Sequence, residues 1–173
     1  DDSSFKLTQP FLNKRITKFL GIDNGRTNEK LTPVGKPLLN RDLNGVSRKY
    51  DWEYRVAIGM LTYLTGSVRP DIAMAVHQCA RFSINPKRLH EQAVMRIGRY
   101  LLSTKEKGMI YRPDCLKGIE VYVDADFAGG WDPTDPMNAE SIYSRTGYVI
   151  CYAGCPVYWQ SKLQTEIALS TAE

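Results

Sequence analysis

The segment from Ile119 to Gly130 constrains the fold of this chain more than any other part of its sequence. Residues of two kinds alternate along it, Ile119, Val121 and Val123 against Glu120, Tyr122 and Asp124. This period of two, with its β-branched and aromatic residues, predicts a β-strand. Asp124 and Asp126 stand where the strand ends and a glycine pair turns the chain, and two carboxylates there can hold a cation against a rigid sheet. A bare Asp-x-Asp motif also occurs in solvated turns, so its role depends on the rest of the chain.

The composition is typical of a globular protein. The chain has 173 residues, of which 43% are hydrophobic and 24% charged, which leaves room for one ordinary domain or two small ones. No apolar run is long enough for a transmembrane helix, and the first residues do not form a signal peptide. With four cysteines, no Cys-x-x-Cys pair and two histidines, a zinc site is not expected. We expect reduced thiols in an intracellular protein.

The charge is distributed unevenly along the chain. Residues 1–118 carry 21 Lys and Arg against 11 Asp and Glu, whereas residues 119–173 carry 2 against 8. A basic half beside an acidic half suggests a module that holds a polyanion next to one that holds a cation.

The first half is predicted to be mostly helical. A short strand over 5–8 precedes a helix over 10–20, where Pro10 suits the first turn and Gly21 ends the helix. Residues 23–51 show no period and predict a long surface connection. Further helices are expected over 52–64, from Pro70, and from Asn85–Pro86. Their apolar faces are predicted from helical spacing: Trp52, Val56, Met60 and Tyr63 or Leu64; Ile72, Ala75, Val76, Cys79 and Phe82; and Ala93, Val94, Ile97, Tyr100 and Leu101.

The last of these helices also carries a basic face. Such a face can be merely solvated. Because the whole first half of the chain is basic, a second interpretation is that this face contacts nucleic-acid phosphates. His77 and His90 flank the apolar faces and are predicted to be packed, hydrogen-bonded core residues, not ligands or bases. The basic residues proposed to bind nucleic acid are Lys87, Arg88, Arg96 and Arg99.

The acidic half is predicted to be an antiparallel meander. After a short strand over 108–112 and the strand that ends at Asp124, a loop rich in Gly, Pro and Asp runs to about residue 144. Strands over 147–152 and 156–161 follow, joined by a turn at Ala153–Gly154. Ser170 to Glu173 fits the S-x-x-E capping box of a helix start. Because the sequence stops there, we expect the chain to be a fragment.

Several motifs, in order along nearly the whole chain, resemble the polymerase of copia-type retrotransposons. Tyr122–Gly129, Ser144–Tyr148 and Ala168–Glu173 are similar to the ribonuclease H domain of those Pol polyproteins. Phe5 to Leu20, Thr32–Pro33, Tyr54–Leu64, Arg69–Ile72 and Arg99–Leu101 are similar to the segment after the polymerase palm. The resemblance implies an α+β fold in which a helical connection module precedes a truncated ribonuclease-H-like β-sheet. Residues 1–112 would end the reverse transcriptase (thumb and connection), and residues 113–173 would begin the ribonuclease H domain.

The resemblance also implies a chemistry. Asp124 and Glu173 match catalytic, metal-binding carboxylates, and Asp126 fits the pattern as a less certain ligand. Two Mg²⁺ ions held by such carboxylates would activate water and stabilise the leaving oxygen while RNA in an RNA–DNA hybrid is cleaved. The family's further catalytic aspartates and its Tyr-x-Asp-Asp motif are missing from this sequence. The loop between Asp132 and Ser144 is also longer than expected. The intact parent is therefore expected to be the enzyme, with the rest of the Pol polyprotein as partner, and this fragment to be inactive alone.

Two other interpretations compete with this one. The chain could be a non-catalytic remnant or a domesticated module that binds DNA or RNA by charge and shape. Alternatively, the Asp-x-Asp motif could belong to a glycosyltransferase, but that class needs a nucleotide-binding α/β domain before the motif, where this sequence predicts helices. Neither of these interpretations, nor the first, involves a membrane.

Overall fold

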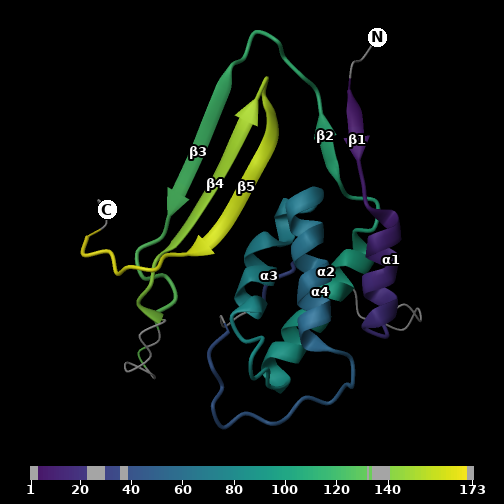
Figure 1. The fold of residues 1–173 in the computed structure, drawn as a ribbon, viewed down its shortest axis with the longest axis vertical. Helices are drawn as coiled ribbons and strands as arrows, with labels where there is room; N and C mark the ends of the chain where they lie inside the picture. The colour runs from purple at the N-terminus through teal and green to yellow at the C-terminus, as the bar shows by residue number, and fades with distance from the viewer. Residues whose placement is uncertain (1–3, 23–29, 36–38, 132, 134–140, 171–173) are drawn as a thin grey trace. The chain divides into compact units, whose positions relative to one another are not determined.

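The computed structural model describes residues 4–22, 30–35, 39–131, 133 and 141–170. The chain divides into two compact units, residues 6–110 and residues 111–173 with the first five residues. We call them the helical unit and the sheet unit, and describe each by itself (Figure 1). The class is mixed α+β, as predicted. The ribonuclease-H-like character of the sheet stays a prediction.

The helical unit contains α1 (Pro10–Phe19), α2 (Tyr54–Ser67), a 3-10 turn (η1, Pro70–Ile72), α3 (Ala73–Ala80) and α4 (Arg88–Ser103). Proline stands at the start of α1 and of η1, where its missing N–H costs nothing. Gly21, with a φ of 67°, ends the α1 segment in a conformation that favours glycine. These helices lie close to their predicted bounds. Within the described part of residues 30–53, the connection forms no helix or strand.

The predicted apolar faces of α3 and α4 are largely confirmed, whereas that of α2 is confirmed at Leu64 and wrong at Val56. On α2 the buried residues are Tyr54, Ala57, Ile58, Leu61 and Leu64. Val56, which we expected in the core, is 48% exposed, and of the two alternatives Tyr63 and Leu64, Tyr63 is 65% exposed and Leu64 is buried. The Tyr54 hydroxyl donates a hydrogen bond of 2.9 Å to the carbonyl oxygen of Cys79 in α3. Because this bond and ring burial turn Tyr54 inward, the residues at three- and four-residue spacing from it form the core face.

Two adjacent residues of α4 fix the long connection. The carboxylate of Glu91, fully buried, accepts hydrogen bonds from the backbone N–H groups of Lys49 (3.0 Å) and Tyr50 (2.9 Å). His90, also fully buried, contacts the Asn40 carbonyl oxygen at 2.7 Å and stacks on Phe82. The prediction that His90 is a packed core residue is therefore confirmed. His77 is half-buried on α3.

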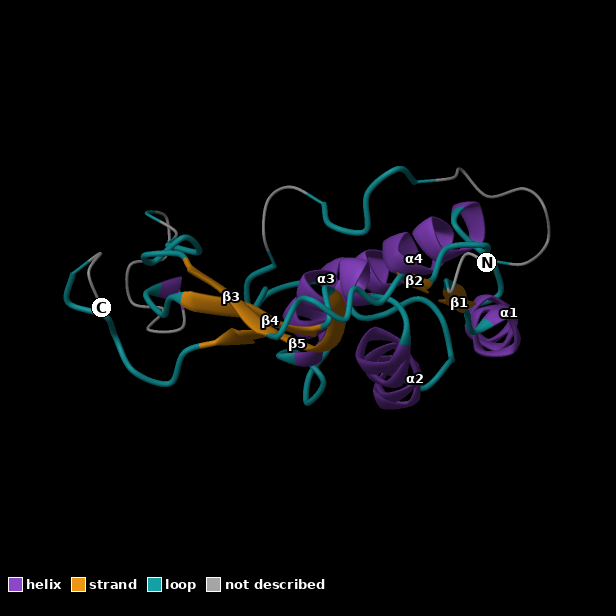
Figure 2. Ribbon diagram, turned by 90° about the horizontal axis from the view of Figure 1, so that it is seen from above, coloured by secondary structure: helices purple, strands orange, loops and turns teal. Residues whose placement is uncertain are grey.

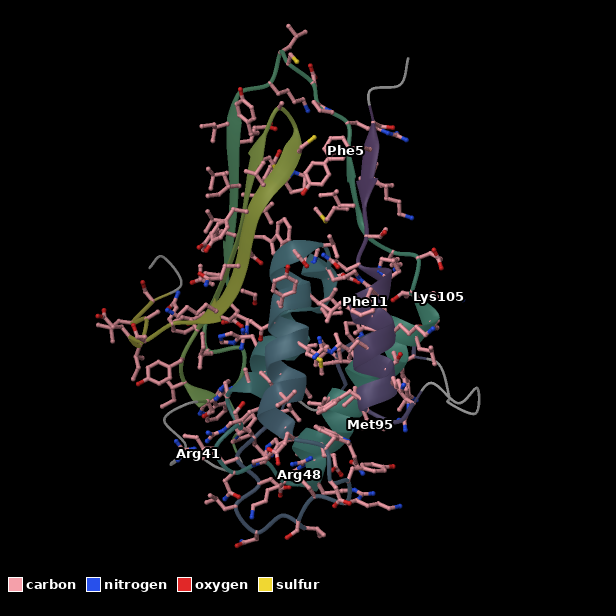
Figure 3. All side chains as sticks on the ribbon, turned by 45° about the vertical axis from the view of Figure 1, so that its right-hand side comes forward. Phe5, Phe11, Arg41, Arg48, Met95 and Lys105 are labelled. Carbon is pink, nitrogen blue, oxygen red and sulfur yellow. The ribbon has the colours of Figure 1, made fainter. Side chains whose placement is uncertain are left out.

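Arg48 adds a third attachment at the same end of the helical unit (Figure 3). Its guanidinium lies 4.6 Å from the ring centre of Trp52 and donates a hydrogen bond to the Trp52 carbonyl oxygen. It also lies 3.4 Å from a carboxylate oxygen of Glu91. The connection before α2 is thus fixed mainly by polar contacts to a helix about 40 residues further along the chain.

The sheet unit is built on an antiparallel meander of β3 (Ile119–Ala125), β4 (Arg145–Tyr152) and β5 (Cys155–Leu163). Ala153 and Gly154 have φ values of 52° and 71°, which is the conformation of the tight two-residue turn that the sequence predicted. The strand order β3–β4–β5 also confirms the predicted meander. A further two-stranded sheet joins β1 (Phe5–Leu7) and β2 (Met109–Tyr111), where the rings of Phe5 and Tyr111 stack at 5.0 Å.

The meander forms a single layer (Figure 2). Register places Val121 beside Ile150 and Ile150 beside Tyr158, so these side chains share one face. Val121 is 57% exposed and Tyr158 52% exposed. Within the part of the chain that the structure describes, this apolar face is therefore largely uncovered. The capping box at Ser170–Glu173 extends beyond the described residues.

Candidate nucleic-acid interface and carboxylate pair

Three of the four basic residues predicted on α4 line one groove in the helical unit. Arg88, Arg96 and Arg99 lie on one face of α4, since they recur at spacings of eight and three residues. The groove has a volume of about 400 Å³ and lies between α4, α3 and the connection. Lys30, from the connection, adds a fourth cationic side chain to its lining. Lys87 is half-buried just before α4 and does not line the groove.

The positive charge of this groove is only partly neutralised. Arg88 lies 3.6 Å from the carboxylate of Glu91. Arg96 donates hydrogen bonds to the carbonyl oxygen of Thr32 (3.1 Å) and to its hydroxyl (2.8 Å), which are neutral acceptors. The Nε of Arg99 is buried and has no hydrogen-bond partner among the described residues. No aspartate or glutamate belongs to the described lining, and the Glu91 carboxylate beside Arg88 lies outside it, so an anion entering the groove meets a cationic lining.

The other surfaces of the groove are apolar and aromatic. Ala75 and Cys79 contribute from α3, and Val34, Leu39 and Tyr50 contribute from the connection. Burial raises the pKa of the Cys79 thiol to about 12. This thiol is therefore protonated at neutral pH, and we assign it to packing instead of nucleophilic chemistry.

The two aspartates of the Asp-x-Asp motif have different environments. Asp124 is exposed near the end of β3, directly opposite Gly147 of β4. Asp126 lies just beyond the strand, where its backbone N–H donates to the Arg145 carbonyl oxygen (3.0 Å) and its Oδ1 accepts from the Arg145 N–H (2.5 Å). One oxygen of Asp126 therefore already closes the end of the β3–β4 ladder, which weakens its candidacy as a metal ligand.

The third predicted ligand, Glu173, lies outside the described residues. The described residues contain no group of three or more His, Cys, Asp or Glu side chains placed to hold a metal ion. The structure thus brings Asp124 and Asp126 to the same end of β3, and their catalytic and metal-binding roles stay predictions.

A polar cluster around the buried Arg69, which the sequence analysis missed, joins η1 to the end of α4. Arg69, 1% exposed, donates two hydrogen bonds to Asp71 (2.9 and 2.8 Å) and two more to Thr104. The Tyr100 hydroxyl donates to Asp71 at 2.7 Å. Burial alone would raise the pKa of Asp71, but the hydrogen bonds from Arg69 and Tyr100 outweigh it and lower that pKa. The Arg-Pro-Asp sequence of residues 69–71 could have indicated this cluster, because it places an ion pair at a helix start.

All four cysteines are free thiols. Across the described ranges, no helix combines the length and apolar character needed to cross a membrane.

Comparison with known proteins identifies sequence relatives of this chain. The chain is 41% identical over 122 residues to the Retrovirus-related Pol polyprotein from transposon TNT 1-94 of Nicotiana tabacum, a match that covers 69% of the chain and 8% of that protein. It is 35% identical over 121 residues to the corresponding polyprotein from transposon RE1 of Arabidopsis thaliana, covering 70% of the chain and 8% of the relative. It is also 37% identical over 120 residues to Secreted RxLR effector protein 161 of Plasmopara viticola, covering 69% of the chain and 79% of that protein.

Two of these three relatives are polyproteins of transposons. The chain is homologous to a segment of retrotransposon Pol polyproteins, broadly of the copia type. This confirms the predicted family at that level. The chain spans about 8% of the length of the plant polyproteins it matches. No family model matches the chain, and no solved structure does.

Proposed function

We propose that this chain is a nucleic-acid-binding segment from the reverse transcriptase and ribonuclease H region of a Pol polyprotein. The observation that carries the proposal is the groove along α4, where Arg96 and Arg99 stand without a carboxylate counter-ion among the described lining residues. Phosphate backbones supply the missing negative charge, and guanidinium groups bind phosphate oxygens well. The family relation supports this assignment, because a Pol polyprotein segment has nucleic acid as a natural partner.

We further propose that the intact polyprotein hydrolyses the RNA of RNA–DNA hybrids with Mg²⁺ as cofactor, as the sequence resemblance implies. Asp124 fits a ligand role because its carboxylate is exposed at a strand end. Asp126 fits it less well, because one of its oxygens is engaged by Arg145. The described residues alone do not complete a metal site, so the two-metal chemistry would need carboxylates in addition to these two.

The binding proposal is tested by the salt dependence of affinity. Anisotropy of a labelled RNA–DNA hybrid should show binding that weakens steeply between about 50 and 200 mM salt. Arg99→Glu should weaken binding and reduce the slope of log K against log salt by at least about 1, since one phosphate contact is lost. Arg15→Glu, which reverses an exposed charge on α1 of the same unit, is the matched control. Equal effects of the two variants, or affinity that does not respond to salt, would contradict the proposal.

A second candidate function is a non-catalytic module that binds nucleic acid outside any polymerase. One observation favours it: the chain covers 79% of a relative, Secreted RxLR effector protein 161, against 8% of the plant polyproteins. The reading frame of the source gene discriminates the two. Continuation after Glu173 into a helix with further aspartates supports the polymerase, and a stop codon supports the separate module.

A further inference from the structure

The groove on α4 has a feature that binding to a phosphate backbone does not require. A surface that only follows the backbone of a duplex needs cations, whereas this groove combines cations with an apolar floor and an aromatic ring. Its volume of about 400 Å³ lies within the range of roughly 300–1,000 Å³ that is typical of small-ligand sites. The lining therefore fits a ligand that has both a negative charge and a flat, weakly polar part.

Tyr50 is the aromatic element of this lining. Tyr50 is 41% exposed, and the Nζ of Lys49 lies 5.7 Å from its ring centre, so part of the ring is open to a ligand. Its backbone is fixed, because the Tyr50 N–H donates a hydrogen bond of 2.9 Å to the fully buried carboxylate of Glu91. The guanidinium of Arg88 lies 5.9 Å from the ring centre. An accessible ring on a fixed backbone beside cations is the arrangement with which proteins stack nucleobases of single strands.

The floor of the groove also offers amide groups. Gln78 on α3 is 6% exposed, and its side-chain Oε1 accepts a hydrogen bond of 3.3 Å from the guanidinium of Arg81. Gln92 on α4 is exposed and lines the same groove. Amide side chains both donate and accept hydrogen bonds, so they can satisfy the polar edge of a base. A nucleobase thus finds a ring, an apolar floor and hydrogen-bonding groups within one cavity.

We infer that the groove holds one nucleotide of a single-stranded nucleic acid, with its base against Tyr50 and its phosphate facing Arg96 and Arg99. This inference rests on the proposed nucleic-acid function and deepens it, because it names an unpaired nucleotide as the occupant. In a duplex, stacking covers the faces of interior bases and pairing occupies their Watson–Crick edges, so the groove favours a single-stranded stretch or a frayed strand end over the interior of a hybrid.

The test compares two ligands of equal charge and length, a labelled eight-nucleotide oligo(dT) and its abasic analogue. Three proteins are used at one salt concentration: the unchanged chain, Tyr50→Leu and Tyr50→Phe. Both substitutions keep the backbone N–H that binds Glu91, and only the phenylalanine keeps the ring. Stacking on an aromatic side chain strengthens binding by about 5- to 150-fold per base, so Tyr50→Leu should lose affinity for oligo(dT) by a factor in this range. Tyr50→Phe should change it less than about twofold, and the abasic strand should bind all three proteins equally.

A second measurement keeps the inference testable if Tyr50→Leu folds poorly. Thymidine 5′-monophosphate and inorganic phosphate are each titrated into the unchanged chain and followed by NMR. The mononucleotide should shift amide signals around Tyr50 and Gln78, and phosphate alone should shift only those near Arg96 and Arg99. Equal affinity for oligo(dT) and the abasic strand, or identical shifts from both small ligands, would overturn the inference while leaving salt-dependent binding, and so the proposed function, intact. Absence of any nucleic-acid binding would overturn both.

Discussion

Replacing Glu91 by glutamine should destabilise the helical unit far more than its small change in shape suggests. The carboxylate is fully buried and accepts two backbone hydrogen bonds, from Lys49 at 3.0 Å and from Tyr50 at 2.9 Å. Arg48 and Arg88 lie 3.4 and 3.6 Å from it. A glutamine keeps one oxygen acceptor, but it presents an amide N–H₂ to the other backbone donor and removes the negative charge between two guanidinium groups.

The magnitude follows from these contacts. A hydrogen bond to a charged acceptor contributes about 1.5–3 kcal/mol, and a buried donor left without an acceptor costs about 1–3 kcal/mol. Because the two effects overlap at one N–H group, Glu91→Gln should lower the free energy of unfolding by about 2–4 kcal/mol. This is a large part of the total of about 5–15 kcal/mol that is usual for a domain.

Urea denaturation of the full chain, followed by circular dichroism at 222 nm, measures this loss, since the described α-helices all lie in the helical unit. Glu106→Gln is the matched control, because Glu106 is exposed just after α4 and should change stability by no more than about 0.5 kcal/mol. Hydrogen exchange adds a local test: the amides of Lys49 and Tyr50 should lose protection in Glu91→Gln. Equal stability of the two variants would refute the assignment of Glu91 as the anchor of the connection.

Three further predictions concern acid stability, catalysis and the sheet. Burial lowers the pKa of His90, so its contribution to stability should be present above the unfolded-state pKa of about 6.5 and be lost as pH falls below it; urea midpoints between about pH 7.5 and 5 should fall less in His90→Asn. The chain alone should not cleave RNA in a hybrid with Mg²⁺ or Mn²⁺, because the carboxylates expected of the site are incomplete; a gel assay showing cleavage that Asp124→Asn abolishes would contradict this. The uncovered face around Val121 should bind the dye ANS, and Val121→Thr should reduce the dye fluorescence, with unchanged fluorescence as the opposing outcome.

The sequence predicted those features that depend on neighbouring residues. Helical spacing located the buried faces of α3 and α4, and alternation with a Gly-containing turn located β3, β4 and β5. It failed where a distant partner decides the outcome. The residues around Glu91 do not indicate that it is buried. The N–H groups that satisfy its buried carboxylate belong to Lys49 and Tyr50, about 40 residues earlier.

The same limitation applies to the candidate sites. The sequence identified Arg88, Arg96 and Arg99 as one basic face, but not the groove, whose opposite wall and aromatic ring come from the connection. On α2 the spacing allowed two overlapping faces. The hydrogen bond from Tyr54 to Cys79 in another helix selects between them, and periodicity alone contains no information about that bond.

The attachment of the connection to α4 has a consequence for motion. Thr32, Asn40, Val46 and Tyr50 are held by hydrogen bonds to α4 side chains or to its first backbone N–H, and the neighbouring Val34 and Leu39 are only partly buried against the core. Segments fixed in this way open at lower free energy than the helices beneath them and exchange their amides as a group. We therefore expect the described parts of the connection to form a separate exchange unit, whose opening would widen the groove while the helical core stays folded.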